Sequence, residues 1–372
     1  MRNNLHNILD VNVNIGRVKE LVKSEGKKRK WPREDNMMAS SNGGGIQRYF
    51  ITLEYVGTRF LGFQKQKGMR TVQGVLEAAF EMFVGHPVVS AASSRTDTGV
   101  HATANVCHVD VVRYSKRKPG EVMPPHEPET VKKAVNHFLQ KEGDDVAIVD
   151  VRRVPLDFHA RFQAKERTYH YRILAGTGLL SVFEKDRAWH VPEELDLADM
   201  QEACRVLIGH HDFSSFRAAG CQALSPLKTL DELNVCETPT WPCFPTQEQR
   251  RSFTPASESC KDKGESLSGS EDMDVNAGAK RKLRCFVVTA RARSFLYHQV
   301  RLLVGLLKAI GSKALTTKDV QRILDAQTIT ATPAMAPACG LYLVDVKYNF
   351  TCSNSKERHT DVADDGLDEF SN

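Results

Sequence analysis

Apolar residues in the first half of the chain follow strand-like and helix-like spacings in turn. Runs rich in aromatic and β-branched residues predict strands at 48–55, about 87–94, 103–111 and 146–152. Apolar positions three or four residues apart predict two amphipathic helices, marked by Val72, Leu76, Phe80 and Phe83 and by Val131, Ala134, Val135, Phe138 and Leu139. In chain order the elements are β-α-β-β-α-β.

The same order returns in the second half of the chain. Strands are predicted at 167–174, near 228–236 and 283–292, and at 341–348. Helical spacing marks one helix by Met200, Ala203 and Leu207 and another by Val300, Leu303, Val304 and Leu307. Two successive β-α-β-β-α-β units are typical of two ferredoxin-like halves, each an antiparallel sheet with helices on one face. We therefore expect an α+β fold with halves at 47–155 and 156–350.

Three polar segments interrupt or flank this pattern. Residues 1–46 carry nine Lys or Arg against five Asp or Glu, and their Gly/Ser-rich end disfavours a packed element. A Pro-, Ser- and charge-rich insertion occupies 237–282, where a hairpin tip can absorb it because loop closure becomes only slowly more costly with length. Residues 351–372 carry six acidic and two basic residues. We expect a flexible basic leader, a disordered insertion and a disordered acidic tail.

The leader also bears on the compartment. Its run Lys27-Lys28-Arg29-Lys30 is either a nuclear address or a solvated tail. The leader has no apolar stretch of the kind found in secretory signals, and its acidic residues argue against an organellar transit peptide. We expect an intracellular protein of the nucleus or cytoplasm, with an organelle as the open alternative.

Composition excludes several classes of protein. The 372 residues are 41% hydrophobic and 26% charged, as in globular proteins, and no apolar run approaches the ~20 residues of a membrane span. The nine cysteines are scattered without a C-x-x-C pair, which argues against a zinc ribbon or a thioredoxin-type site and fits reduced thiols. Outside the three polar segments the chain has a net charge of +6, which suits a polyanionic partner.

The segment 93–102 places one carboxylate, Asp97, among hydroxyls in the link between two predicted strands. Ser, Thr, Asp and Gly are also turn residues, so one interpretation is a polar hairpin turn with a self-capping aspartate.

The segment 158–171 interleaves cations with aromatic rings, which suits unpaired RNA bases but also an ordinary exposed sheet face. Arg301 adjoins the apolar face of a predicted helix, so it either needs a buried anionic partner or extends to solvent.

Six motifs in this order resemble the TruA family of tRNA pseudouridine synthases, and the likeness covers about 47–350. They are Ser-Arg-Thr-Asp-x-Gly-Val-His-Ala, Asp-Phe-His-Ala-Arg-Phe-x-Ala, Tyr-x-Tyr, Asp-Phe-x-Ser-Phe-Arg-Ala, Phe-Leu-x-His-x-Val-Arg and Gly-Leu-Tyr-Leu. Two departures are Phe63-Gln64, where the family commonly has Trp-Gln, and Tyr297-His298-Gln299, where it has His-His-Met. Both leave the family's catalytic set in place.

The resemblance implies a role for individual residues. Asp97 is similar to the family's catalytic aspartate, and Arg301 to the arginine that pairs with it. Arg95 resembles the arginine that helps turn the target nucleotide out of the RNA stack, and Tyr169 the tyrosine that packs on the flipped uracil. His159 and Arg161 are candidate contacts to the RNA backbone, and a packing role for His159 is the alternative.

The implied activity is isomerisation of uridine to pseudouridine in tRNA, around the anticodon stem-loop. Such a reaction involves no redox change or phosphate transfer, so we expect no cofactor and no metal. The RNA partner is tRNA, and the family suggests a homodimer. Three rival hypotheses are a non-catalytic RNA-binding protein on the same scaffold, a pseudouridine synthase acting on another RNA, and a glycosidase. A glycosidase usually needs two cooperating carboxylates, whereas only Asp97 stands in a convincing setting.

Overall fold

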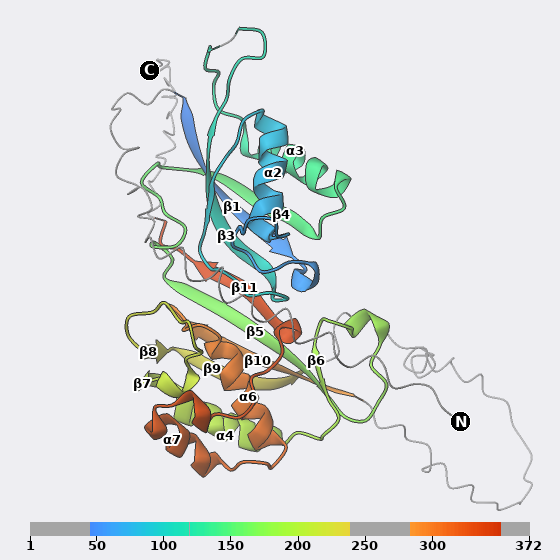
Figure 1. The fold of residues 1–372 in the computed structure, drawn as a ribbon, viewed down its shortest axis with the longest axis vertical. Coiled ribbons are helices and arrows are strands. Elements are labelled where there is room, and N and C mark those ends of the chain that lie inside the picture. Colours follow the sequence, from blue (N-terminus) through green and yellow to red (C-terminus); the bar gives the residue numbers. More distant parts are fainter. Residues whose placement is uncertain (1–44, 119, 239–282, 351–372) are drawn as a thin grey trace, which may run out of the picture. The chain divides into compact units, whose positions relative to one another are not determined.

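The computed structural model describes residues 45–118, 120–238 and 283–350, and its main feature is a large mixed sheet (Figure 1). The strands are β1 (Ile46–Tyr55), β2 (Ser90–Ala92), β3 (His101–Val112), β4 (Val146–Val154), β5 (Glu166–Ala175), β6 (Trp189–Val191), β7 (Gly209–Asp212), β8 (Leu227–Leu230), β9 (Glu232–Thr238), β10 (Arg284–Ala292) and β11 (Leu341–Lys347). Neighbouring strands follow the order β4-β1-β3-β11-β5-β10-β9, with β2 paired to β3 and β6 paired to β5. Strands β7 and β8 form a separate pair.

Helices accompany both ends of the large sheet. The α-helices are α2 (Val72–Val84), α3 (Pro128–Lys141), α4 (Leu197–Leu207), α6 (Gln299–Gly311) and α7 (Thr317–Ala326). Short 3₁₀ helices are η2 (Gly57–Arg59), η3 (Val182–Glu184), η4 (Ser214–Phe216), η5 (Ile329–Ala331) and η6 (Ala338–Gly340). The expected α+β class is confirmed, and each strongly periodic segment forms the predicted type of element.

The two halves share one arrangement of strands. In the first half the order is β4-β1-β3-β2, and in the second it is β11-β5-β10-β9. The fourth strand lies beside the first and the third beside the second in both, as two ferredoxin-like units require. The boundary between residues 155 and 156 remains a prediction.

The expectation of two antiparallel sheets needs a correction, because the halves join into one mixed sheet. Strand β11 pairs in parallel with β3 through Tyr342 and His101 and through Leu343 and Ala102. On its other side β11 runs antiparallel to β5. Pairing satisfies backbone groups that an open strand edge would leave exposed, and this favours the join. The join also places the loop before β3 next to the second half.

Two apolar clusters pack on either side of this join. The first unites β1, β3 and β4 with α2 and α3, and includes Tyr49, Leu76 and Val135. The second unites β5, β9 and β10 with α4, α6 and α7, and includes Phe286. Tyr169 on β5 packs against both clusters. The residue at the boundary of the two cores is thus one of the predicted site residues.

The remaining differences from the sequence-based expectations are local. The strand expected near 228–236 is two strands, β8 and β9, which pair with different neighbours on either side of Asp231. Helix α7 was not predicted. Glu237 and Thr238, the first two residues of the expected insertion at 237–282, belong to β9, and the rest of that segment lies outside the described residues. Of the expected leader at 1–46 only Gly45 and Ile46 are described, and Ile46 begins β1. The expected acidic tail lies outside the described residues. Within the described ranges, none of the helices has the length and apolar character needed to cross a membrane.

Candidate active site

Asp97 lies in the loop between β2 and β3, which the segment 57–63 holds in place. The backbone N–H of Phe63 donates to the carbonyl of Thr96 at 3.0 Å. Within the loop, the N–H of Val100 donates to the carbonyl of Asp97 at 3.1 Å and closes a turn. The turn is therefore closed by main-chain groups, which leaves the carboxylate available for contacts with another element.

The hydroxyls beside the aspartate belong to a buried polar network. Thr96 Oγ1 and Tyr55 OH lie 2.7 Å apart, and Asn105 Nδ2 donates to Tyr55 OH at 3.1 Å. Asn105 also donates to the carbonyl of Ser94 at 3.2 Å and accepts from Ser93 Oγ at 2.9 Å. Buried polar groups need such partners, so these residues anchor the loop to β1 and β3. Their role is structural, and the aspartate side chain stays 24% exposed.

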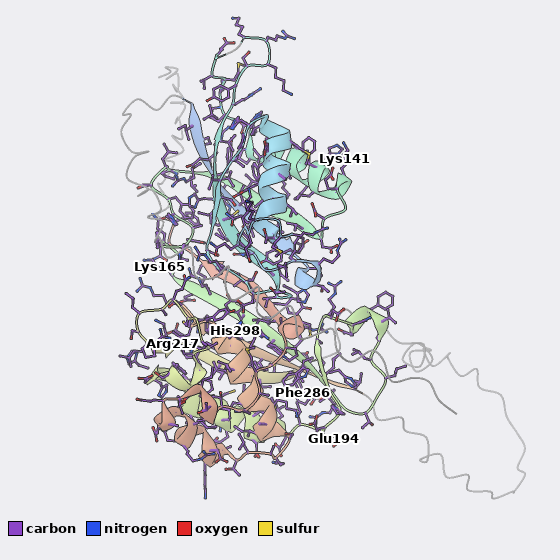
Figure 2. All side chains as sticks on the ribbon, viewed as in Figure 1. Lys141, Lys165, Glu194, Arg217, Phe286 and His298 are labelled. Carbon is purple, nitrogen blue, oxygen red and sulfur yellow. The ribbon has the colours of Figure 1, made fainter. Side chains whose placement is uncertain are left out.

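The beginning of α6 meets the carboxylate of Asp97. His298 Nε2 lies 3.3 Å and Arg301 Nη1 lies 3.9 Å from the same Asp97 oxygen, Oδ2. Arg301 is fixed by Ala336, whose carbonyl accepts from Arg301 Nε at 2.8 Å. His298 precedes α6 with a left-handed φ of +63°, and its ring stacks on Tyr297 with 3.7 Å between centroids. Figure 2 labels His298 at this helix start.

Burial and charge act in opposite directions on this cluster. Burial raises the pKa of Asp97, and the charges of His298, when it is protonated, and of Arg301 counter that rise. Burial also lowers the pKa of His298; the Asp97 carboxylate opposes this change and Arg301 adds to it. A histidine with a lowered pKa is largely neutral near pH 7, whereas an arginine stays charged. Arg301 is therefore the permanent counter-charge of the carboxylate.

Tyr169 lies close to this cluster from the side of β5. Its pKa is raised by burial and also by the negative charge of Asp97, while a hydrogen bond with Ser94 acts against the rise. Its ring meets Phe295 edge-on, with 5.3 Å between centroids. Tyr169 is therefore within electrostatic range of the Asp97 carboxylate.

Arg95, His159 and Arg161 form a neighbouring group of polar residues. Arg95 is exposed, and its pKa is lowered by burial of part of the side chain and by the positive charge of Arg161. His159 Nδ1 accepts from the N–H of Arg161 at 3.2 Å. His159 also contacts the ring of His108, with 4.8 Å between centroids, so the packing role that the sequence left open is part of what it does.

Arg167 connects the Asp97 loop with the group that contains Arg161, although it was not among the candidate site residues predicted from the sequence. Its Nη2 donates to the carbonyls of Ser93 at 2.9 Å and Arg161 at 3.0 Å. Its Nε donates to Ser94 Oγ at 3.0 Å, and its Nη1 to the carbonyl of Arg293 at 2.5 Å. A single buried guanidinium thus holds together the loop before β3, the turn before β5 and the segment after β10.

The structure therefore brings Asp97, Arg301 and Tyr169 together and places Arg95, His159 and Arg161 beside them. Sequence reasoning missed His298 and Arg167. His298 lies within the motif Phe-Leu-x-His-x-Val-Arg, which was the available signal. The spacing of residues around Arg167 carried no such signal.

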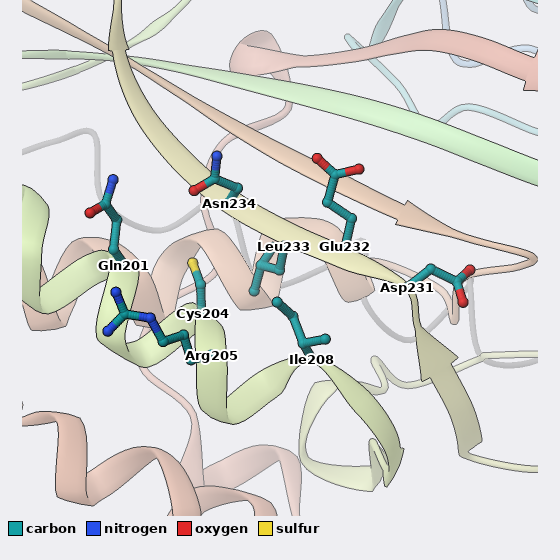
Figure 3. A pocket seen from close by; sticks show the side chains of 8 residues that line it. All are labelled: Gln201, Cys204, Arg205, Ile208, Asp231, Glu232, Leu233 and Asn234. Atoms are coloured by element: carbon teal, nitrogen blue, oxygen red, sulfur yellow. The ribbon is translucent and has the colours of Figure 1, made fainter.

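A separate hollow lies between α4 and β9, with a volume of about 380 Å³ (Figure 3). It shares no residue with the Asp97 cluster and is lined by Gln201, Cys204, Arg205, Ile208, Asp231, Glu232, Leu233 and Asn234. Within the described ranges, no group of three His, Cys, Asp or Glu side chains is arranged to hold a metal ion. The Asp97 cluster is thus the candidate site.

Comparison with known proteins gives consistent matches over most of the chain. A family model described as "tRNA pseudouridine synthase" matches residues 51–163 and 203–349. The chain belongs to this family. It is 38% identical to tRNA pseudouridine synthase A of Xanthobacter autotrophicus, over 82% of this chain and 100% of that protein. It is 38% identical to tRNA pseudouridine synthase A of Paramagnetospirillum magneticum, over 82% of this chain and 96% of that protein. It is 36% identical to tRNA pseudouridine synthase A of Bartonella henselae, over 82% of this chain and 100% of that protein.

Membership of the family confirms the resemblance seen in the motifs. The two matched blocks include Asp97, His159, Arg161 and the start of α6, whereas Tyr169 and Arg167 lie between them. The three relatives are bacterial, so they give no support to a nuclear address, and the basic run at 27–30 lies outside the described residues.

Proposed function

We propose that this chain converts uridine to pseudouridine in tRNA, with Asp97 as its catalytic carboxylate. Family membership supports the reaction and the class of RNA. The observation that carries the assignment of Asp97 is the position of its carboxylate, partly buried and facing His298 and Arg301 of another element. Main-chain groups close the turn, so the turn itself does not require a carboxylate at this position.

The reaction breaks the bond between uracil N1 and C1′ of the ribose and forms a bond from uracil C5 to the same carbon. Uracil C5 loses its proton and the released N1 takes one up from solvent, so atoms and electrons balance without an oxidant. The reaction needs an ionised carboxylate at the sugar, either as a nucleophile at C1′ or as a base toward a sugar proton. Arg301 favours the ionised form of Asp97 and so opposes the burial that raises its pKa.

The surrounding residues then act on the RNA. A uridine inside a stacked helix must be flipped out, at a cost of roughly a few kcal/mol. Arg95 has a planar cation that can fill the vacated place or hold a phosphate. Tyr169, whose pKa responds to the charge of Asp97, can pack on the flipped uracil, and Arg161, near Arg95, can contact the RNA backbone together with His159.

Asp97→Asn tests the catalytic assignment. The variant should bind tRNA about as well as the wild type and release no tritium from tRNA labelled at C5 of uridine, because the amide cannot supply the ionised oxygen. Asp325→Asn, at the exposed end of α7, is the matched control and should keep full activity. Tritium release by Asp97→Asn at the wild-type rate would contradict the assignment. A wild-type protein that binds tRNA without release would instead be a pure RNA-binding protein.

Two finer features belong to the same proposal. We place the target uridine in or near the anticodon stem-loop, which mapping of pseudouridines in tRNA before and after treatment with the protein would test. We also expect a homodimer, which sedimentation of the purified chain would test; a monomer that is fully active would exclude a dimeric site.

A further inference from the structure

A series of three contacting rings reaches the surface in the turn between β4 and β5. The buried ring of His108 on β3 contacts His159 at 4.8 Å, and His159 contacts Phe162 at 4.3 Å between centroids. Phe162 is the outermost of the three rings and is 69% exposed. The His108 and His159 rings meet edge-on and the His159 and Phe162 rings are tilted by 35°, so two imidazoles support a large apolar ring that leaves most of its surface open to solvent.

The exposure of Phe162 is not a property of a loosely held loop. The N–H of Ala160 donates to His108 Nδ1 at 3.2 Å, and Tyr348 OH donates to the carbonyl of Ala160 at 2.6 Å. The N–H of Gln163 donates to the carbonyl of His159 at 3.0 Å. Ala160 itself is fully buried. Hydrogen bonds and packing on both sides therefore hold the turn in one conformation.

Positively charged residues lie in the neighbourhood of the exposed ring. The guanidinium of Arg161 lies 5.8 Å from the centre of the Phe162 ring, a cation–π distance. Arg95 is near enough for Arg161 to lower its pKa, and the exposed Lys165 follows three residues after Phe162 (Figure 2). A flat apolar face among cations suits an unpaired nucleotide, which brings a base to stack and a phosphate to neutralise.

The ring is also linked rigidly to the candidate active site. Arg167 Nη2 bonds both to the carbonyl of Arg161 and to that of Ser93, which begins the Asp97 loop. The distance between Phe162 and Asp97 is thus set by a buried guanidinium. A base stacked on Phe162 would lie at a defined position relative to the nucleotide held at Asp97.

We propose that Phe162 is a stacking platform for an unpaired base of the tRNA, separate from the target uridine. The inference rests on the proposed function for the identity of the RNA. Charge complementarity selects RNA over an apolar protein partner, because three cationic side chains would be unfavourable at an apolar interface. The platform would define how far from the target the RNA must offer an unstacked base.

The test compares variants of Phe162 in the Asp97→Asn background, so that binding is measured without turnover. With an unmodified tRNA transcript, Phe162→Ala should weaken binding roughly 5- to 150-fold, the range for loss of one stacked base. Phe162→Trp should bind as tightly as the parent, and Phe162→Leu should be as weak as Phe162→Ala, since leucine has bulk but no flat face. Phe183→Ala removes another exposed ring, 65% exposed on η3, and should have no effect.

Two readouts separate stacking from a general structural effect. Phe162→Ala should bind a fully paired RNA duplex as the parent does and keep the same dependence of binding on salt, because no phosphate contact is lost. Arg161→Gln should reduce that salt dependence. Equal tRNA binding by Phe162→Ala and the parent would overturn the proposal, as would a change in self-association with unchanged RNA binding.

Failure of this inference and failure of the proposed function are distinguishable. Tritium release by the wild-type protein tests the reaction, and the binding series tests the platform without any reaction. A wild type that releases tritium while Phe162→Ala binds tRNA normally would leave the function in place and remove the platform.

Discussion

Arg301 and His298 approach one oxygen of Asp97, yet they do not contribute equally. Burial raises the pKa of the carboxyl group and lowers that of the imidazole, so both groups are driven toward their neutral forms. Only the guanidinium keeps its charge over the whole accessible pH range. At the scale of single residues, the ionisation of Asp97 therefore depends mainly on Arg301.

Replacing Arg301 with leucine should change the pH profile of the reaction. Without the guanidinium, burial raises the pKa of Asp97 further, and the acid limb of kcat against pH moves to higher pH. The loss of activity should be greater at pH 6 than at pH 8. Single-turnover tritium release with saturating tRNA across this range is the measurement.

A control and a contrary outcome accompany this experiment. Arg322→Leu removes an exposed arginine of α7 and should leave the profile unchanged. If Arg301→Leu lowers kcat equally at every pH, the arginine acts on the substrate and not on the ionisation of Asp97.

The candidate site also depends on how whole elements fit together. The link from η2 to α2 lies directly against the Asp97 loop: a Cβ at Gly62 would meet the carbonyl oxygen of Thr96 at 2.8 Å. Gly62 also has a φ of +82°, which favours glycine. Gly68 in the same link has a φ of +73° but open space around it. The two glycines thus differ in packing, but both have a backbone conformation that would be strained in a residue with a side chain.

Gly62→Ala and Gly68→Ala should therefore have different effects on catalysis. Both variants lose stability because alanine is strained in the left-handed backbone conformation. Only Gly62→Ala also overpacks against the Asp97 loop, which destabilises the fold by a further amount of about 1–3 kcal/mol. We expect kcat to fall at least tenfold in Gly62→Ala and to change less than twofold in Gly68→Ala. Urea unfolding and tritium release measure the two effects, and equal kcat values for both variants would show that the loop tolerates the contact.

At the scale of the whole molecule, His101 joins the two halves. Its Nδ1 accepts from the N–H of Gly57 at 3.0 Å, which places the proton on Nε2, and Nε2 lies 3.1 Å from the carbonyl of Cys339. Its ring stacks on Tyr342 of β11 with 4.7 Å between centroids. Only the neutral ring can accept from Gly57, so the junction depends on an uncharged imidazole.

Stability should fall as the pH drops below 6.5. Burial lowers the pKa of His101 to about 4, so between pH 6.5 and 4 the unfolded chain binds a proton that the folded chain does not. The lowering corresponds to roughly 3 kcal/mol lost across this window. His101→Gln should be less stable at pH 7 and lose less of its remaining stability on acidification.

Urea unfolding at several pH values between 7 and 4 measures this effect. Part of the dependence of the unfolding free energy on pH should remain in His101→Gln, because burial lowers the pKa of His108 to about 4 as well. His137→Gln, an exposed position on α3, should reproduce the wild-type slope. An unchanged slope in His101→Gln would show that the imidazole does not titrate differently in the folded chain.

Local pattern predicted much of the fold but little of its assembly. The periodic helices and strands were visible because each buries one face, whereas α7 was overlooked although Val320, Ile323 and Leu324 have helical spacing. The pairing of β3 with β11 joins residues 241 positions apart, so the local spacing of apolar residues could not reveal it. Likewise the motifs selected Asp97 and Arg301, but the shared oxygen and the part played by His298 arise only from the packing of one half on the other.

Strand β11 lies between β3 and β5, although it is the last strand of the described chain. During synthesis on the ribosome, the middle of the sheet is therefore filled after both of its flanks exist. Until residues 341–347 emerge, β3 and β5 each present an open edge, and such edges invite pairing with other chains. The nascent protein depends on β11 to close that gap, and a chain that stops before residue 341 would leave the ribosome with two open, aggregation-prone strand edges and without the join that brings the two halves of the site together.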